Sequence, residues 1–283
     1  MSVFLLPGLL LYLAFFLLPA LQGFAFSLFS WQGFTAVAFV GLKNYARLLD
    51  DAVLKESVVH MVYLVAVYVT LPVVLGLVCA DLLFRGRVKG ATFFRTIYFL
   101  PQVFTTTAVG ILFMWMAEPN YGMVNSLLHA VHLDFLRRPW LGDEKFAIHA
   151  IALMTVWLNF GYVMVILLAG IQKINASLYE AADLDGTSSL QKLLFVTVPS
   201  LRNEFLVVII LMIINALNTY PLIQAATGGG PGYATMVPAY WGFRVFSAQS
   251  NLGYGSTIIN VLVVLTAVIT LATFSLRGEE DGR

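Results

Sequence analysis

Hydrophobic residues follow one another along this chain in long stretches that no charged residue interrupts, and the polar residues gather between them. Each stretch exceeds the roughly 20 residues that a helix needs to cross about 30 Å of hydrocarbon at about 1.5 Å per residue. Because lipid offers backbone groups no hydrogen-bond partner, each stretch is predicted to be helical. The stretches free of Asp, Glu, Lys and Arg are 1–42, 57–80, 96–117, 146–172, 205–243 and 245–276.

The two longest stretches each contain one span and a loop. Residues 31–42 and 227–241 are rich in glycine, polar and turn-forming residues, so neither is predicted to hold a second crossing. The predicted fold is therefore an all-α integral membrane protein with six transmembrane helices. We place these helices at residues 4–29, 58–80, 96–116, 147–170, 205–226 and 253–276.

Composition supports a membrane protein. Of 283 residues, 60% are hydrophobic and 11% are charged, and the mean hydropathy is +0.86. The net charge of +1 and the lack of a basic stripe argue against nucleic-acid binding. No internal repeat or linker is visible, so residues 1–283 are predicted to form a single transmembrane domain. The one cysteine, Cys79, permits no intrachain disulfide and is expected to be a small buried hydrophobe.

Basic residues predict the orientation in the membrane. The loop between spans two and three carries Arg85, Arg87, Lys89 and Arg95 within fifteen residues. Lys and Arg are enriched in cytoplasmic loops, so this loop is predicted to be cytoplasmic. Alternation then places residues 173–204 and both termini on the cytoplasmic side.

The spans lack the residues that ion-driven transport and nucleotide binding require. None contains Asp, Glu, Lys or Arg, and carriers driven by protons or sodium usually hold such a residue near the midplane. His60 and His149 lie about one turn inside their spans and are expected to form interfacial hydrogen bonds. The chain has no Gly-Lys pair and so no phosphate-binding loop of that type. We expect neither an enzyme nor a cofactor or metal site.

The loop between spans four and five is predicted to form two short helices joined by a glycine turn. Ser177 with Glu180 fits a capping box at the start of the first helix, and Ser188 with Gln191 fits a second one. Between them, Gly186 provides a left-handed stop for the first helix.

The second of these helices carries an apolar stripe of Leu190, Leu193 and Leu194, at i, i+3 and i+4. Pro199 is expected to limit the helix. A short solvated loop cannot cover this stripe by itself. It packs either on the protein's own helix ends or the lipid interface, or against a cytoplasmic partner.

This loop carries a resemblance to a known family. Glu180-Ala181-Ala182, then Gly186, then Val196-x-Val198-Pro199 is similar to the E-A-A loop of the membrane subunits of binding-protein-dependent ABC importers. Asn175 stands where the family usually has proline. Further matches to the sugar-uptake branch, the maltose, lactose and glycerol-phosphate permeases, are Phe39–Tyr45, Phe94–Pro101, Tyr121-Gly122 with Asn125, Leu168–Gly170, Thr227–Pro231 and Gly253–Gly255.

The resemblance implies a type I ABC importer transmembrane domain in a bacterial or archaeal cytoplasmic membrane. It implies four kinds of partner: a second permease subunit, two ATPase subunits that bind ATP and magnesium, an external solute-binding protein and a sugar. The coupling loop would span about residues 175–200. The residues that would couple it to the ATPase are Glu180, Ala181, Ala182, Gly186, Leu190, Leu193, Leu194 and Pro199.

Polar and aromatic residues in spans four and five are candidates for the substrate path. Amides and hydroxyls hydrogen-bond to sugars, and aromatic rings stack on the C–H face of a sugar ring. Hydrogen bonding between helices explains the same residues equally well. The candidates are Asn215, Asn218, Thr219, Tyr220 and Gln224 in span five and Trp157, Asn159 and Tyr162 in span four.

Several alternatives stay open at the level of sequence. Arg137, Arg138, Trp140 and the turn near Gly229 are either an external docking surface or ordinary solvated loop. The chain is alternatively an assembly or sensor subunit, or a facilitator that needs no ATPase. The sequence does not name the sugar, although spans without Lys or Arg argue against an anionic one. Nor does it decide whether the second permease is a sister chain or a copy.

Overall fold

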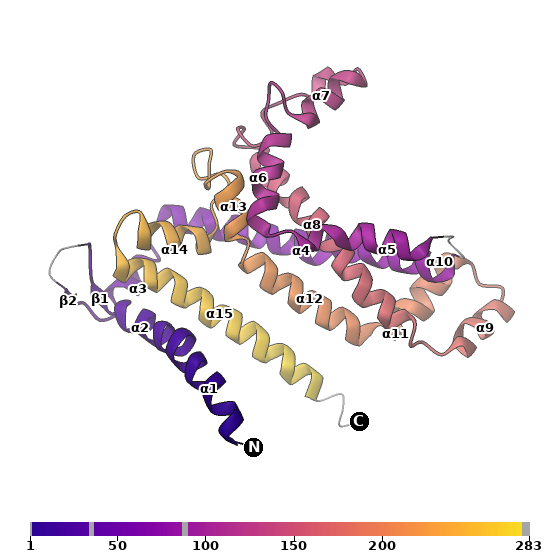
Figure 1. The fold of residues 1–283 in the computed structure, drawn as a ribbon, viewed down its shortest axis with the longest axis horizontal. Coiled ribbons are helices and arrows are strands. Elements are labelled where there is room, and N and C mark those ends of the chain that lie inside the picture. Colours follow the sequence, from indigo (N-terminus) through magenta and orange to yellow (C-terminus); the bar gives the residue numbers. More distant parts are fainter. Residues whose placement is uncertain (1, 34–36, 87–89, 279–283) are drawn as a thin grey trace. The chain divides into compact units, whose positions relative to one another are not determined.

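The computed structural model describes residues 2–33, 37–86 and 90–278, and these are mainly helical (Figure 1). They fall into two compact units. The first comprises Met1–His60 with Met236–Ile269, and the second comprises Met61–Thr235 with Thr270–Arg283. The single transmembrane domain over residues 1–283 stays a prediction. Arg87, Lys89 and the tail beyond residue 278, which helped to orient the chain, lie outside the described residues.

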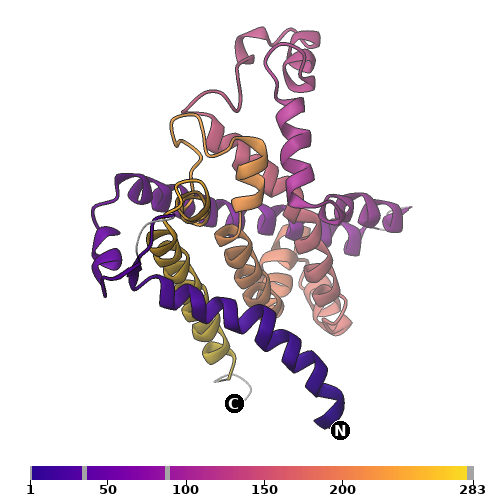
Figure 2. The same ribbon diagram turned by 60° about the vertical axis from the view of Figure 1, so that its left-hand side comes forward.

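The first unit joins the two ends of the sequence. Its first span is a continuous rod in which a π turn, Leu13–Leu17, connects two helices (Figure 2). The window of this span at Leu5–Phe26 has no buried residue, as expected of a helix surrounded by lipid. The elements of this unit are α1 (Ser2–Tyr12), α2 (Leu18–Phe26), β1 (Phe29–Ser30), β2 (Ala38–Phe39), α3 (Lys43–Arg47), the first turns of α4 (Ala52–Arg85), α14 (Pro238–Ser247) and α15 (Leu252–Gly278).

Side-chain amides connect the beginning of the chain to its end within this unit. Asn44 donates to the carbonyls of Ser27 (2.8 Å) and Phe29 (3.0 Å), and Asn260 of α15 donates to Gly23 of α2 (3.0 Å). These bonds join the end of α2 and the strand that follows it to α3 and α15. The sequence motif around Asn44 is therefore explained by the way it holds the first span.

Both loops that the sequence predicted contain more structure than expected. The segment 31–42 contains β2, which pairs antiparallel with β1 in the register Phe29↔Phe39 and Ser30↔Ala38. The segment 227–241 is too long as a loop prediction, because α14 begins at Pro238. Proline lacks an N–H and is favoured in the first turn of a helix, so Pro238 marks a start.

The Asp51 carboxylate organises the turn before α4. It accepts hydrogen bonds from the Tyr254 hydroxyl (2.7 Å), the Leu54 amide (2.9 Å) and the Trp241 indole (2.9 Å). Burial raises the pKa of Asp51, but these hydrogen bonds outweigh burial and lower it overall. The Arg47 guanidinium lies 4.2 Å above the Tyr254 ring. A single carboxylate thus holds α4, α14 and α15 together.

The second unit is built around α8 (Ala147–Ile171), the most buried span. Gly161 of α8 meets the backbone of α5 (Ala91–Phe99): a Cβ at this position would lie 1.7 Å from the Tyr98 carbonyl oxygen. The remaining elements are the part of α4 beyond His60, α6 (Thr106–Met116), α7 (Met123–Ala130), α9 (Ala176–Leu184), α10 (Ser189–Lys192), α11 (Val198–Ser200), α12 (Arg202–Leu217), α13 (Tyr220–Ala226), the 3₁₀ turns Leu100–Val103 and Asp134–Leu136 and the π turn Leu193–Thr197.

The two span histidines have hydrogen-bond partners, as predicted. His60 Nδ1 lies 3.0 Å from the Met236 carbonyl oxygen in the first unit, and His149 Nδ1 lies 2.6 Å from the Tyr63 hydroxyl in the second. Cys79 has no disulfide partner and is half-buried.

The structure accommodates six spans, two of which are bent. Four helices of the described chain are long and apolar enough to cross a membrane by themselves, and two bent pairs raise the number to six. The unbroken ones are Leu5–Phe26, Ala52–Arg85, Ala147–Ile171 and Leu252–Ala272. The sequence placed these four well.

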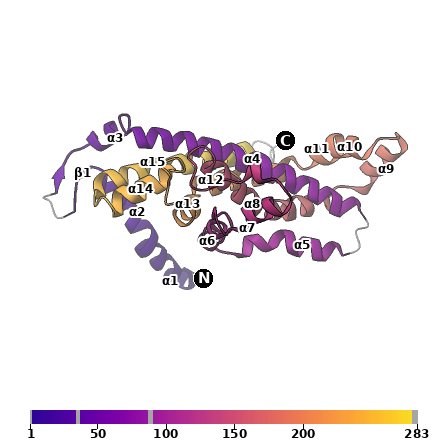
Figure 3. The ribbon, with the colours of Figure 1, turned by 90° about the horizontal axis from the view of Figure 1, so that it is seen from above.

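The third span, predicted as one helix over 96–116, is broken. Ala91–Val103 and Thr106–Met116 meet at 97°, and Figure 3 shows α6 almost end-on beside the length of α5. Pro101 cannot continue the backbone ladder, and Phe104 is extended. Thr105 then caps α6 by accepting a hydrogen bond from Ala108 N (3.3 Å).

The fifth span, predicted as one helix over 205–226, also differs from the prediction. Helix α12 ends at Leu217, and α13 begins at Tyr220. Pro221 causes this interruption, because its ring would clash with the carbonyl of Leu217 and it has no N–H to donate there. The bent pair runs from Ser189–Ser200 into Arg202–Leu217, at 77°.

Candidate functional site

The segment between α8 and α12 forms the predicted helix, glycine turn and helix. Gly186 follows α9 with φ +70°, in the left-handed region. The Thr187 amide (3.1 Å) and hydroxyl (2.6 Å) both donate to the Ala182 carbonyl oxygen. Asp183 of α9 forms an ion pair with Lys192 of α10. The turn thereby holds both helices close to each other. After the role that the resemblance implies, we refer to residues 175–200 as the coupling loop.

One of the two predicted helix caps is correct. The Ser188–Gln191 capping box is present in both directions, with Ser188 N donating to Gln191 Oε1 (2.7 Å) and Gln191 N to Ser188 Oγ (3.3 Å). The Ser177–Glu180 box is wrong. Asn175 is the cap and accepts a hydrogen bond from Ser177 N at 3.1 Å.

The wrong cap has a simple cause. The helix begins at Ala176, so Ser177 already lies inside the first turn, where its hydroxyl cannot take the capping position. Asparagine is as good a cap as serine, and its position one residue before the helix was the signal that the motif match overlooked. Glu180 and Ala181 are exposed and do not cap the helix, whereas Ala182 is buried.

The apolar stripe of the coupling loop is largely uncovered within the chain. Leu190 is 64% exposed and Leu194 50% exposed, while Leu193 is partly covered. Pro199 does not end the helix as expected. A π turn over Leu193–Thr197 widens the backbone, α11 carries the helix on to Ser200, and the direction changes at Leu201.

A polar cavity of about 200 Å³ lies where the third span breaks and where α12 ends before α13. Three residues that line the cavity come from the break in the third span, and three more come from the interruption at the end of α12. The uninterrupted helices α4 and α8 provide the rest of the lining. This arrangement is typical of membrane transport sites, where an interrupted backbone is tolerated next to a water-filled cavity. The lining residues are Tyr68, Gln102, Phe104, Thr106, Leu158, Asn159, Asn215, Asn218 and Thr219.

Hydrogen bonds cross the cavity wall between helices. Asn215 Nδ2 donates to Asn159 Oδ1 (3.2 Å), and Asn159 Nδ2 donates to the Thr155 carbonyl within α8 (2.8 Å). The hydroxyls of Thr219 and Tyr68 lie 3.2 Å apart. These side chains therefore find hydrogen-bond partners within the protein, and no charged side chain lines the cavity in the described part of the chain.

The structure brings together four of the eight predicted substrate-path residues. Asn159, Asn215, Asn218 and Thr219 line the cavity. Trp157 does not: it is 36% exposed, and its ring packs edge-on against Phe113 at 5.5 Å. The others that do not line it are Tyr162, Tyr220 and Gln224.

Sequence reasoning missed the residues that the third span contributes. Gln102, Phe104 and Thr106 follow Pro101 and become cavity wall only because the helix breaks there. Pro101 was the available signal, since a proline inside a helical pattern ends or kinks the helix. Tyr68 could not have been found in this way, because it lies within an uninterrupted helix.

The long loop between α6 and α8 is held together by its own side chains. Asn125 is 3% exposed, donates to the carbonyls of Pro119 (3.1 Å) and Arg138 (3.0 Å) and accepts from the Trp140 indole (2.9 Å). The Arg138 guanidinium lies 4.0 Å above the Phe146 ring. Arg138 and Trp140, two of the candidate docking residues, thus build the loop itself.

Arg137, the third of these candidates, pairs with Asp134 at 3.1 Å. Hydrogen bonds from His129 and from Arg137 lower the pKa of the exposed Asp134 carboxyl. Gly229 sits in a left-handed turn at φ +83°. No group of three or more His, Cys, Asp or Glu side chains gathers into a metal-binding arrangement in residues 2–33, 37–86 or 90–278.

The second unit thus combines a polar cavity at two interrupted spans with a helical loop after its core helix, an arrangement typical of membrane transport proteins. The chain belongs to the family of binding-protein-dependent transport system inner membrane components, whose family model matches residues 72–277. The recognised family, the six-span all-α fold and the location in the inner membrane as a multi-pass protein are thereby confirmed.

Individual relatives cover nearly the whole chain. A probable ABC transporter permease of Bacillus subtilis, YurN, is 34% identical over 99% of this chain and 97% of its own. The trehalose/maltose permease MalF of Thermococcus litoralis is 33% identical over 94% of this chain and 89% of its own. The diacetylchitobiose permease NgcF of Streptomyces coelicolor is 30% identical over 94% of this chain and 78% of its own. By their names these relatives are permease subunits rather than enzymes.

Solved structures agree on the fold. A bacterial ABC transporter involved in the import of the acidic polysaccharide alginate has a chain with a TM-score of 0.83 and 20% identity, which covers 97% of this chain and 93% of its own. A structure of the alginate transporter with its periplasmic protein gives a TM-score of 0.79, also at 20% identity, over 96% and 91%.

Proposed function

We propose that this chain is the permease subunit of an ATP-driven importer and that an uncharged carbohydrate passes through its polar cavity. The observation that carries the proposal is the cavity at the two interrupted spans, which is lined by amides, hydroxyls, two aromatic rings and one leucine, none of them charged. Such groups both donate to and accept from sugar hydroxyls. The relatives named for trehalose, maltose and diacetylchitobiose support a carbohydrate.

The coupling loop would dock on partner ATPase subunits. Its exposed Leu190 and Leu194 form an apolar surface that the chain does not cover, and the loop carries the Glu180-Ala181-Ala182 motif of the importer family. An exposed apolar stripe of this kind is typical of a protein interface. ATP and magnesium would bind to the partners, and this chain would need no cofactor of its own.

Transport would proceed by alternating access, driven by closure of the ATPase pair. A second permease subunit would complete the pathway, and an external solute-binding protein would deliver the sugar. This topology requires the coupling loop, and hence both termini, on the cytoplasmic side. It agrees with the basic residues of the loop after α4.

A tagged copy of the chain tests the proposal. It is extracted gently from its native membrane, and the proteins that accompany it are identified by mass. We expect an ATPase and a second permease, and we expect the complex, reconstituted in vesicles, to accumulate a neutral oligosaccharide only with ATP. A chain that emerges alone, with solute flux indifferent to nucleotide, would establish a facilitator or assembly protein instead.

A further inference from the structure

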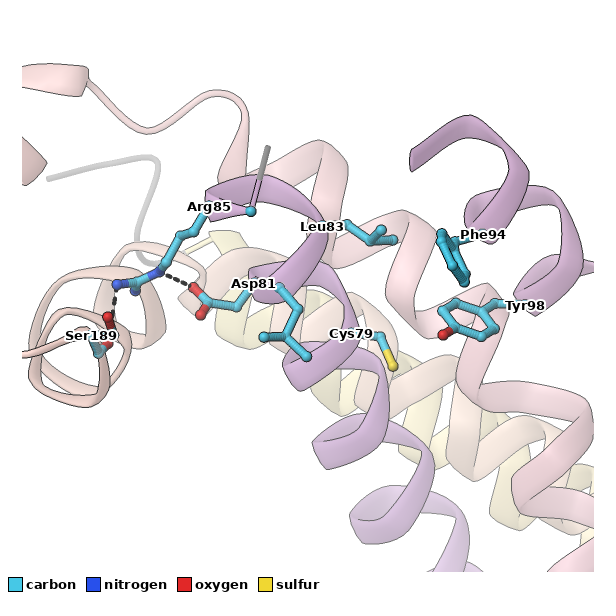
Figure 4. Close-up of a pocket in the computed structure, with 9 residues that line it drawn as sticks. Cys79, Asp81, Leu83, Arg85, Phe94, Tyr98 and Ser189 are labelled. Carbon is cyan, nitrogen blue, oxygen red and sulfur yellow. Dashed lines mark hydrogen bonds and ion pairs between the residues drawn. The ribbon is translucent and has the colours of Figure 1, made fainter. Parts of the chain in front are cut away.

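The cytoplasmic end of α4 is fastened to the coupling loop by one arginine (Figure 4). Arg85 Nε donates to Asp81 Oδ1, one turn earlier on α4, at 2.6 Å. Its Nη1 donates to the Ser189 carbonyl oxygen at the start of α10, at 3.0 Å. Its Nη2 donates to the Thr197 hydroxyl, at 3.3 Å. One planar guanidinium thus binds a carboxylate, a backbone carbonyl and a hydroxyl from three separate points of the chain, a geometry that lysine cannot reproduce.

The same contact reaches the first helix of the coupling loop. The Thr197 hydroxyl lies 3.0 Å from the Tyr179 hydroxyl of α9, and the Tyr179 ring packs on Phe84 of α4 at 5.7 Å. The Arg85 guanidinium lies 5.8 Å from the centre of that ring. Arg85 therefore contacts α10 and the π turn directly, and α9 through Tyr179.

Two of the three groups that Arg85 contacts are shielded from water, whereas Ser189 is exposed. Thr197 is 0% exposed and Asp81 is 8% exposed. The side chain of Arg85 is 20% exposed. A pocket of about 440 Å³, lined mostly by apolar residues such as Leu83, Phe94 and Tyr98, lies beside the ion pair (Figure 4). Charge-assisted hydrogen bonds are stronger in such surroundings than in bulk water.

Helix α4 leads from this contact to the polar cavity. It runs without interruption from Tyr68, which lines the cavity, to Arg85. Seventeen residue steps of about 1.5 Å span about 25 Å. A displacement of the coupling loop would therefore move the cytoplasmic end of α4, and the same rigid helix forms part of the cavity wall at Tyr68.

We propose that Arg85 is a positioning residue for transport: together with Asp81 and Thr197 it forms a latch that makes α4 move with the coupling loop. The latch rests on the proposed function, because it transmits a motion that a docked ATPase would impose. It concerns the step after docking. Removing it leaves the ATPase bound and hydrolysing ATP, while less of that hydrolysis moves sugar.

The test measures three quantities on the reconstituted complex: ATPase co-purification, ATP hydrolysis, and sugar molecules transported per ATP. For Arg85→Gln we expect unchanged co-purification and a ratio of sugar to ATP that falls about tenfold. Arg85→Lys keeps the charge but loses the fork, and should fall between Arg85→Gln and wild type. The matched control is Lys173→Gln, an exposed cation close to the coupling loop, which should leave the ratio unchanged.

Two milder variants keep the proposal testable if Arg85→Gln does not fold. Thr197→Val and Tyr179→Phe each remove one hydroxyl and nearly preserve shape, and each should lower the ratio about two- to fivefold. If variants at Arg85, Thr197 and Tyr179 all leave the ratio of sugar to ATP unchanged, the latch is overturned. A loss of ATPase in proportion to the loss of transport also overturns it, because Arg85 would then shape the docking surface. Failure of the proposed function appears separately, as wild type that binds no ATPase.

Discussion

Replacing Gly186 tests whether the coupling loop depends on its left-handed turn. The residue has φ +70°, and a Cβ added there meets no atom of this chain within 4 Å. Any penalty inside the chain is therefore conformational rather than steric. An L-residue in this region costs roughly 1–2 kcal/mol, and a β-branched one is a genuine outlier. The Gly186→Val variant should consequently populate the native turn about 5- to 30-fold less.

The loss should be visible in coupling rather than in membrane insertion. The turn holds Asp183 and Lys192 in their ion pair and aligns Thr187 with the Ala182 carbonyl. We expect Gly186→Val to reach the membrane at wild-type level, to retain less ATPase on purification at rising salt, and to take up little sugar. The assay compares sugar uptake per permease in cells with ATPase yield from the same membranes.

Gly186→Asn is the matched control, since asparagine tolerates the left-handed region better than other residues. It should keep most of the uptake. Wild-type uptake by Gly186→Val would refute the reasoning. An equal loss of uptake in the Gly186→Val and Gly186→Asn variants would also refute the conformational explanation. The two residues differ in backbone preference, so an equal loss would come from the presence of a side chain at the partner surface.

Three further predictions concern packing, charge and the cavity. Gly161→Ala should destabilise the protein by about 1–3 kcal/mol or more in thermal unfolding, because its Cβ would overlap the Tyr98 carbonyl. Asp51→Asn should lower stability by about 1–3 kcal/mol at neutral pH. Folding lowers the pKa of Asp51 below its usual value of 3.8. The ionised carboxylate therefore stabilises the fold above pH 3.8, and this stabilisation is lost as the pH falls through the folded-state pKa. The variant and wild type should consequently converge in stability in acid. Asn218→Ala should weaken sugar affinity in transport assays, and transport identical to wild type would remove Asn218 from the substrate path. Asn159→Leu should chiefly lower the yield of folded protein.

The sequence predicted most of the fold because spanning a membrane leaves little choice. An uncharged stretch longer than 20 residues has few stable arrangements in lipid, and the four unbroken spans lie within a few residues of their predicted positions. The Ser188–Gln191 cap and the Gly186 turn were also predictable, since each depends on residues a few positions apart. Local chemistry in these places determines local structure.

The breaks were harder to predict because a proline has several possible effects. Pro72 lies within the continuous helix α4, whereas Pro101 and Pro221 accompany interruptions and Pro199 lies within a helix widened by a π turn. The polar side chains near each proline differ. Thr105 caps the helix after Pro101, and the Asn218 and Thr219 side chains before Pro221 donate to carbonyls of the last turn of α12. Sequence pattern alone does not show whether such polar groups will be in place.

The structure also separates two roles that the sequence left joined. Asn215 donates to Asn159, Asn159 donates to the Thr155 carbonyl, and the Thr219 hydroxyl donates to the Ala216 carbonyl at 2.7 Å, so these groups mainly satisfy polar atoms inside the membrane. Asn218 and Gln102 are exposed at the cavity, and Asn218 uses only its Nδ2, on the Ile214 carbonyl at 2.9 Å. A solute entering the cavity meets these two side chains without first breaking a bond between helices. Affinity for the sugar should therefore depend on the exposed pair, while the buried amides keep the interrupted helices intact.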